Sequence, residues 1–323
     1  MHTPLYHALA RPLLARRRRS AIAAATAAHA ELAALRIGPS LAQGPKSGIF
    51  AASYGGAPVV VKIDVTGKAA DAIRLEAANL AALYPAMAEG PLRLPRPVLH
   101  IPEAGIGVTE RAKGRRLSDA LRGASTARRA RAIEQVGAWL ALYTAARRRR
   151  TSIGPFYWAE LQRTLAASAP RAVDRTAALA IAQALASMAD TIRGSQITQA
   201  VVHGDLTARN LMWDGTVMTG IDTASEAWWP LSKDAARFLV QLTGARPTRR
   251  LPGSSAPPPG AIAEADRAAL VASGVLRSEP PAVLDFFTGV EIGRRLCRPQ
   301  TLLTERGRNH ALARAWLACH AAK

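Results

Sequence analysis

His203-Gly204-Asp205-Leu206-Thr207-Ala208-Arg209-Asn210, followed by Gly220-Ile221-Asp222, is the most informative stretch of the sequence. Apolar pairs flank the first segment and an apolar residue precedes the last aspartate, which predicts short strands joined by a polar loop. Asp205 and Asn210 stand five positions apart, and Asp222 follows on the next predicted strand. A tight loop at this spacing aims a carboxylate and an amide into the same cleft.

These three polar residues match the needs of phosphoryl transfer. That reaction requires a carboxylate near the attacking hydroxyl and oxygen ligands that hold Mg²⁺ against the phosphates. Asp205 is predicted to be the catalytic carboxylate. Asn210 and Asp222 are predicted to be the metal ligands, because Mg²⁺ favours carboxylate, amide and water oxygens. Taken singly, each residue is more often a cap or a turn residue, so the prediction rests on their combination.

Two further elements upstream of this loop carry charged residues in regular structure. The run Val59–Ile63 reads as a strand that carries Lys62. Glu76 lies fourteen positions later, in a predicted helix over Asp71–Leu83 that Pro85 is expected to end.

A glycine-containing loop precedes this strand, with the sequence Gly44-Pro45-Lys46-Ser47-Gly48. Gly44 and Gly48 let backbone N–H groups approach phosphate oxygens, and Ser47 adds a hydroxyl. By itself the loop is an ordinary hairpin turn.

Together and in this order, the motifs resemble the aminoglycoside phosphotransferase and choline kinase group of the protein-kinase-like superfamily, over roughly residues 36–243. His-Gly-Asp in place of His-Arg-Asp is typical of that group. Only eleven residues separate Asp222 from Asp234, which is short for the activation segment of a protein kinase. The resemblance therefore points to a small-molecule acceptor and away from a protein substrate.

The resemblance also implies roles for the upstream residues. Lys62 would contact the α- and β-phosphates of ATP and stabilise the transferring charge, and Glu76 would pair with Lys62. The segment Val108–Gly114 is similar to the family hinge, whose backbone at Glu110, Arg111 and Ala112 would hydrogen-bond the adenine edge. The nucleotide site would thus comprise Gly44, Ser47, Gly48, Lys62, Glu76, Glu110, Arg111 and Ala112, with ATP and Mg²⁺ bound.

Some positions depart from the family pattern or carry two interpretations. Thr223 follows Asp222 where the relatives have phenylalanine, so the packing partner of the metal ligand differs. Asp234 is expected to be structural, either as a helix N-cap or as a brace to the catalytic loop, and His203 is expected to orient that loop. Trp228 and Trp229 would form either a wall for the acceptor or ordinary core packing.

The predicted fold is α+β, a bilobal protein-kinase-like fold with a small antiparallel sheet and a larger helical lobe. Residues 1–35 form an arginine- and alanine-rich helical leader, 36–110 the nucleotide-binding N-lobe, and 111–323 the C-lobe with the catalytic loop, metal ligands and acceptor site. Further predicted elements are strands over Val98–Ile101 and Ile106–Glu110, helices over Ser125–Arg149 and Thr176–Ile192, and a Pro/Gly/Ser loop over 244–260.

The net charge of +20 is concentrated in one segment. Residues 111–202 hold sixteen basic and five acidic residues. Two readings stay open: solvated helix faces, or a surface for an anionic partner, with Arg115 and Arg116 the best-placed candidates. No nucleic-acid motif accompanies the charge, which argues against a nucleic-acid partner. Peripheral membrane contact stays open.

The acceptor region also has a basic excess. Residues 223–323 hold eight acidic and fourteen basic residues, which favours a neutral or anionic acceptor over a polycationic aminoglycoside. Cys297 and Cys319 show no disulfide or zinc spacing, which fits a reducing, cytoplasmic compartment. No apolar run is long enough for a transmembrane helix.

The sequence therefore predicts an ATP-dependent phosphotransferase that acts on a hydroxyl of a sugar, amino-alcohol or saccharide-type acceptor. The alternatives are an aminoglycoside antibiotic kinase and a non-catalytic kinase-like module that binds a nucleotide or another anion.

Overall fold

The computed structural model describes residues 4–44, 47–64, 69–154, 165, 172–243, 261–298 and 303–320. The chain divides into two compact units. The first comprises residues 1–114 and 212–226, and the second comprises residues 115–211 and 227–323. The first unit thus includes Asp222, which the sequence division assigned to the C-lobe.

A five-stranded sheet with the order β1-β2-β3-β6-β5 forms the centre of the first unit. The pairs β1–β2, β2–β3, β3–β6 and β5–β6 are all antiparallel. Alternate residues of the central strand are buried, as period-2 alternation requires; they are Val59, Val61 and Ile63. The sheet strands are β1 (Leu35–Gln43), β2 (Ser47–Tyr54), β3 (Ala57–Asp64), β5 (Pro97–Ile101) and β6 (Ile106–Glu110), which confirms the predicted strands.

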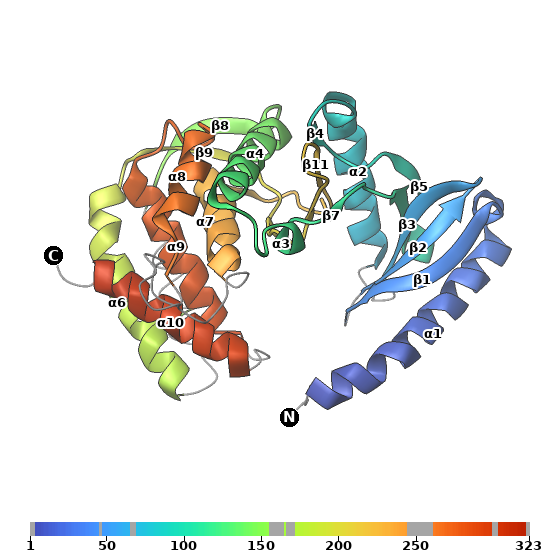
Figure 1. Ribbon diagram of the computed structural model, residues 1–323, viewed down its shortest axis with the longest axis horizontal. Coiled ribbons are helices and arrows are strands. Elements are labelled where there is room, and N and C mark those ends of the chain that lie inside the picture. Colours follow the sequence, from blue (N-terminus) through green and yellow to red (C-terminus); the bar gives the residue numbers. More distant parts are fainter. Residues whose placement is uncertain are drawn as a thin grey trace. The chain divides into compact units, whose positions relative to one another are not determined.

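Two helices pack on this sheet (Figure 1). The helix α1 (Pro4–Ala28) runs along β1 and β2 and buries Ile22 in the core of the sheet. The helix α2 (Ala69–Met87) continues past Pro85, so the expected stop at that proline is wrong. The proline removes a backbone hydrogen bond only in the last turn, and burial of Met87 stabilises that turn.

The later segment of the first unit pairs with its earlier chain. The strand β11 (Met218–Gly220) pairs in parallel with β4 (Leu92–Arg93), and β10 (Leu211–Trp213) neighbours β11. Gly114 lies at the end of the predicted hinge with φ +85°. A Cβ atom there would lie 2.4 Å from the Trp213 carbonyl oxygen, so glycine is required for both reasons.

The second unit is mainly helical and carries a small sheet in the order β12-β9-β8. The contacts of α9 with α6, α7 and α10, and of α4 with α8, form its helical core. Its helices are α3 (Leu117–Ala120), α4 (Thr126–Thr144), α6 (Ala172–Ile192), α7 (Leu231–Leu242), α8 (Glu264–Ala272), α9 (Pro281–Leu296) and α10 (Leu303–His320). Its strands are β7 (Arg115–Arg116), β8 (Arg148–Ser152), β9 (Gln196–Val201) and β12 (Trp228–Pro230).

Two helix boundaries differ from the prediction. Ser125 is the N-cap of α4, and its side chain accepts a hydrogen bond from the Arg128 N–H at 3.3 Å. The helix nevertheless ends at Thr144, and the arginine run enters the antiparallel strand β8. A strand alternates its side chains between two faces, which separates neighbouring like charges. The other predicted helix begins at Ala172, four residues before its predicted start at Thr176.

The described residues address two further predictions and leave a third outside their range. Cys297 and Cys319 are both free thiols. None of the described helices is sufficiently long and apolar to span a bilayer. The predicted Pro/Gly/Ser loop over 244–260 lies outside the described residues.

Candidate active site

Lys62 lies between two carboxylates in the first unit. Its Nζ is 3.1 Å from Oε2 of Glu76, which lies on α2. The same Nζ is 2.6 Å from Oδ1 of Asp222, a residue that follows β11 in the chain. The inward-facing residues of β3 flank Lys62, so its own side chain projects from the opposite face of the strand. Burial alone would lower the pKa of Lys62, but Glu76 and Asp222 outweigh it and raise the pKa above its ordinary value. Lys62 is therefore a fixed cation, and the predicted pairing with Glu76 is present.

Asp222 stands in a constrained backbone segment. Its φ of +64° makes it the one residue other than glycine with a positive φ among the described residues. Asn79 holds the following chain, because its Nδ2 donates to the carbonyl oxygens of Thr223 and Ser225 at 2.6 and 2.8 Å. Unusual backbone conformations persist where the surroundings impose them, and they cluster at functional sites.

The sequence analysis did not identify Asn79. The sequence pattern that could have indicated Asn79 is its position three residues after Glu76, which places both side chains on one face of α2. Its near-complete burial as a polar residue could not be read from the sequence.

Arg18 of α1 supports the glycine loop between β1 and β2. Its guanidinium donates to Gln43 Oε1 at 2.7 Å and to the Gly44 carbonyl oxygen at 2.8 Å. A Cβ atom at Gly48 would lie 2.7 Å from Arg18 Cδ, so this glycine makes room for the arginine. The Gly44 N–H donates to the Ser47 carbonyl oxygen at 2.9 Å and closes the loop. The predicted leader thus contributes a buried arginine to the candidate phosphate loop.

The predicted hinge offers fewer backbone donors than expected. The Glu110 N–H donates to the Arg96 carbonyl oxygen at 2.9 Å, and the Arg111 N–H donates to the Pro58 carbonyl oxygen at 3.2 Å. Within the described chain, Ala112 is the residue of these three whose N–H makes no hydrogen bond. Adenine recognition by a hinge donor would therefore fall to Ala112.

Asp205 is the central residue of the predicted catalytic loop, in the second unit. Its side chain is 60% exposed, yet both carboxylate oxygens are held. Arg237 Nη1 of α7 lies 3.1 Å from Oδ1, and Asn210 Nδ2 lies 3.1 Å from Oδ2. Asn210 Nδ2 also donates to the Asp205 carbonyl oxygen at 2.9 Å. Asn210, five positions after Asp205, thus closes a loop that fixes an accessible carboxylate.

Two buried residues, Asp234 and His203, hold the backbone of the loop that carries Asp205. Both oxygens of Asp234 accept from the Gly204 N–H at 3.2 Å, which is the predicted brace. The N-cap position of α7 is Pro230, so the alternative N-cap role is wrong. His203 Nδ1 accepts from the Asp205 N–H at 3.3 Å, so His203 orients the loop from a buried position, as predicted.

Arg237 connects this loop to α9, and the sequence analysis had given it no role. Its Nη1 donates to the Gly204 carbonyl oxygen, and its Nε lies 3.4 Å from Glu291 Oε2. Arg295 Nε contacts the other Glu291 oxygen at 3.0 Å. Burial opposes ionisation of Glu291, but the two arginines hold its pKa below the ordinary value. The signal for Arg237 was its position three residues after Asp234, on the same helix face.

The donor chemistry of the predicted metal ligands suits Mg²⁺. Asn210 uses its NH₂ group to hold Asp205, which reserves its amide oxygen for a cation. Asp222 offers a carboxylate that is half exposed. In the part of the chain that the structure describes, no three His, Cys, Asp or Glu side chains gather into a metal-binding group. Mg²⁺ commonly uses one or two carboxylates together with substrate phosphates, so this donor set fits the ion.

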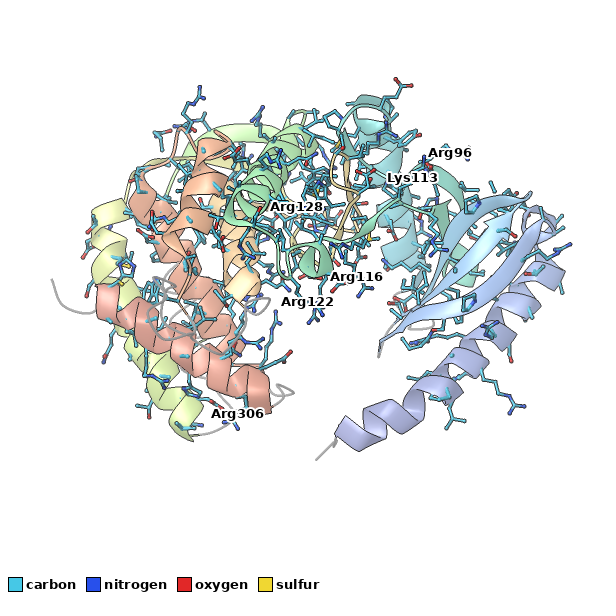
Figure 2. All side chains as sticks on the ribbon, viewed as in Figure 1. Arg96, Lys113, Arg116, Arg122, Arg128 and Arg306 are labelled. Atoms are coloured by element: carbon cyan, nitrogen blue, oxygen red, sulfur yellow. The ribbon has the colours of Figure 1, made fainter. Side chains whose placement is uncertain are left out.

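Two sets of predicted acceptor residues are also placed. Arg115 and Arg116 form the exposed strand β7, and Figure 2 labels Arg116, Arg122 and Arg128 among the side chains of the second unit. Trp228 is 41% exposed, with Arg149 over its ring, so core packing does not account for it.

A protein-kinase-like α+β fold with a held aspartate, a nearby asparagine and a lysine–glutamate pair defines a phosphotransferase of the small-molecule kinase class. A family model described as the phosphotransferase enzyme family matches residues 48–221, and the chain belongs to this family.

Solved structures support the fold. The aminoglycoside phosphotransferase APH(4)-Ia has a TM-score of 0.57 and 13% identity, with 88% of this chain and 96% of that chain covered. A thermostable mutant of that enzyme, in a ternary complex with ADP and hygromycin B, has a TM-score of 0.54 and 14% identity, covering 86% and 94%. Glucosamine kinase in complex with glucosamine, ADP and inorganic phosphate has a TM-score of 0.51 and 15% identity, covering 89% and 82%. No curated protein matches the chain.

Proposed function

We propose that this protein transfers the γ-phosphate of ATP to a hydroxyl group of a small molecule. The observation that carries the proposal is the accessible Asp205 carboxylate, held at one oxygen by Arg237 and at the other by Asn210. Such a carboxylate is oriented to accept a proton and does not serve as a buried structural ion. The first unit would bind the nucleotide, and the second would bind the acceptor.

In the proposed reaction, the acceptor hydroxyl gives its proton to Asp205 while its oxygen forms a bond to the γ-phosphorus. The bond between that phosphorus and the bridging oxygen breaks, and ADP leaves. Lys62 would stabilise the negative charge on the phosphates, and Glu76 would keep the ammonium group in place.

Asn210 and Asp222 would hold Mg²⁺, which neutralises phosphate charge when it is bound. The phosphate loop at Gly44, Ser47 and Gly48 would supply backbone N–H groups, and the hinge would meet the adenine. The solved complexes of APH(4)-Ia and glucosamine kinase contain ADP, which gives nucleotide binding a precedent in the same fold.

The test compares Asp205→Asn with a matched substitution, Asp190→Asn. Asp190 lies on α6 with a largely exposed side chain and an ion pair to Arg193 only one helical turn away. We expect Asp205→Asn to abolish ADP formation with an acceptor panel and to leave ATP binding nearly intact, because it removes a proton acceptor and no phosphate ligand. Asp190→Asn should change neither. Turnover by Asp205→Asn within a few-fold of the unmodified protein would refute the assignment.

A further inference from the structure

Lys233 is a mostly buried amine that the proposed reaction does not use. It lies in the first turn of α7, four residues before Arg237, so both side chains emerge from the same helix face. Its Nζ lies 3.2 Å from the centroid of the Trp229 ring. Within the described residues, Lys233 has this ring contact and no hydrogen bond or ion pair.

Two cations and two carboxylates act on Lys233. Burial, together with Arg294 and Arg237, lowers the pKa of Lys233 to about 7, although Asp234 and Glu291 act in the opposite direction. A buried cation among other cations has a large electrostatic cost unless an anion joins it.

The two nearby carboxylates already have partners. Asp234 accepts the Gly204 N–H with both oxygens, and Glu291 is shared between Arg237 and Arg295. Lys233 and the exposed Arg294 are therefore left with a positive charge that no described carboxylate neutralises at ion-pair distance.

We propose that Lys233, together with Arg294, binds an anionic group of the acceptor, a carboxylate, sulfate or phosphate. The inference deepens the proposed function and rests on it. Arg237 contacts Asp205, and Lys233 lies one helical turn, about 5 Å, before Arg237 in α7. A single small acceptor can therefore place its hydroxyl at Asp205 and its anionic group at Lys233.

The ring of Trp229 gives this site a mixed character. An aromatic face stabilises an ammonium group by cation–π attraction without neutralising it. The ring also supplies an apolar wall beside the cation, and small-molecule sites commonly combine such walls with a few charged groups. Arginine and lysine together suit a carboxylate or phosphate, since arginine binds in two places and lysine as a point charge.

Anion binding at Lys233 has a defined pH dependence. The groups that act on Lys233 are Asp234 and Arg237 on α7, and Glu291 and Arg294 on α9. Below pH 7 the amine is charged and an anion binds directly. Above pH 7 the free amine is neutral, so binding must take up a proton and weakens by up to about tenfold for each pH unit. A neutral acceptor should show no such dependence.

The first test follows the amine itself by competitive acetylation with acetic anhydride, read by mass spectrometry at pH 7 with Mg-ADP present. Sulfate is the probe, and Lys113, which is exposed, is the internal control. A bound anion that raises the pKa of Lys233 by about one unit would slow its acetylation about fivefold, because only the neutral amine reacts. Acetylation of Lys113 should not change.

The second test compares three acceptors that share one ring and differ in charge: glucose, glucuronate and glucosamine. Glucuronate stays ionised from pH 6 to 9, so any pH dependence belongs to the protein. We expect kcat/KM to be highest for glucuronate and to fall above pH 7 for that acceptor. Lys233→Gln should reduce the glucuronate value about ten- to a hundredfold. Lys233→Arg should keep the preference and remove the fall above pH 7, because arginine does not titrate there.

The charge-matched control is Arg131→Gln on α4. This substitution also removes one positive charge, but at an exposed position. It should leave both readouts unchanged. Unchanged Lys233 acetylation in sulfate, or a preference for glucosamine that Lys233→Gln does not alter, would overturn the anion site even if ATP turnover is present. Slowed acetylation without any ATP turnover would retain the anion site as a binding site and refute the proposed function instead.

Discussion

Replacing Arg237 by glutamine separates positioning of Asp205 from stability of the fold. Arg237 donates to Asp205 and to the Gly204 carbonyl oxygen, and it shares Glu291 with another arginine. Asn210 alone would then hold the carboxylate, through one of its two oxygens. We expect kcat to fall about ten- to a hundredfold, because a misplacement near 1 Å has an effect of that size. KM for Mg-ATP should stay nearly constant.

The stability cost follows from the same three contacts. The Asp205 carboxylate is 60% exposed, so its pair with Arg237 contributes less than about 1 kcal/mol. The bond from the charged guanidinium to Gly204 contributes about 1.5–3 kcal/mol. Glu291 would lose Arg237 but would keep its ion pair with Arg295. The destabilisation from the lost Glu291 contact should therefore stay well below the roughly 3–5 kcal/mol that a buried charge without any partner causes. The free energy of unfolding should therefore fall by about 2–4 kcal/mol.

Arg129→Gln is the matched control for that cost. Arg129 of α4 makes two hydrogen bonds to Asp266 of α8, at 2.7 and 2.8 Å, and the Asp266 side chain is only 5% exposed. Losing this pair should lower the free energy of unfolding by about 3–5 kcal/mol, which is at least as large as the decrease expected for Arg237→Gln. Because the pair does not involve the catalytic loop, kcat should be unchanged in the folded variant.

The two variants are to be compared by ADP release at a temperature where both are folded, as urea unfolding would establish. An unaltered kcat in Arg237→Gln would refute the positioning argument. So would an equal loss of kcat in Arg129→Gln, because the effect would then follow stability alone.

Four further perturbations test other parts of the site. Asp222→Ala should weaken nucleotide binding in the presence of Mg²⁺ and not in its absence; equal affinities in titrations of both kinds would contradict the ligand role. Asn79→Ala removes two buried hydrogen bonds to the chain after Asp222 and should lower stability by about 1–3 kcal/mol while raising the Mg²⁺ concentration needed for turnover; an unshifted Mg²⁺ titration would show a structural role only. Arg18→Leu should raise KM for ATP more than it lowers kcat, as steady-state kinetics can separate. In the double variant Arg115→Ala/Arg116→Ala, the salt-induced loss of kcat/KM for an anionic acceptor should be blunted; an unchanged salt slope would mean that both arginines only face water.

The sequence predicted the parts of the site that depend on order and spacing. The strand with Lys62, the helix with Glu76 and the loop from Asp205 to Asn210 have local patterns, and each is present where expected. Family membership was predicted from the same motifs, and the matching region confirms it.

Contacts between distant segments could not be predicted in this way. Arg18 reaches the glycine loop from a helix that had no assigned role, and Asn79 contacts a segment far along the chain. Arg237 occurs in a basic region where an individual arginine carries no distinguishing pattern. The arginine run in β8 was predicted as helix because nothing local revealed its pairing with β9.

The first unit is assembled from two separated stretches of chain, and this has a consequence for its synthesis. The strand β4 is synthesised early, but its partner β11 is synthesised only after the helices α3, α4 and α6. The nucleotide-binding half therefore cannot complete its fold as an independent N-terminal domain, although N-terminal domains generally fold first. A nascent chain arrested at Gly114 would lack Asp222, the partner of Lys62, and would be expected to expose the edge that β11 later covers. Arrest beyond residue 226 should be the earliest point at which protease resistance of this half appears.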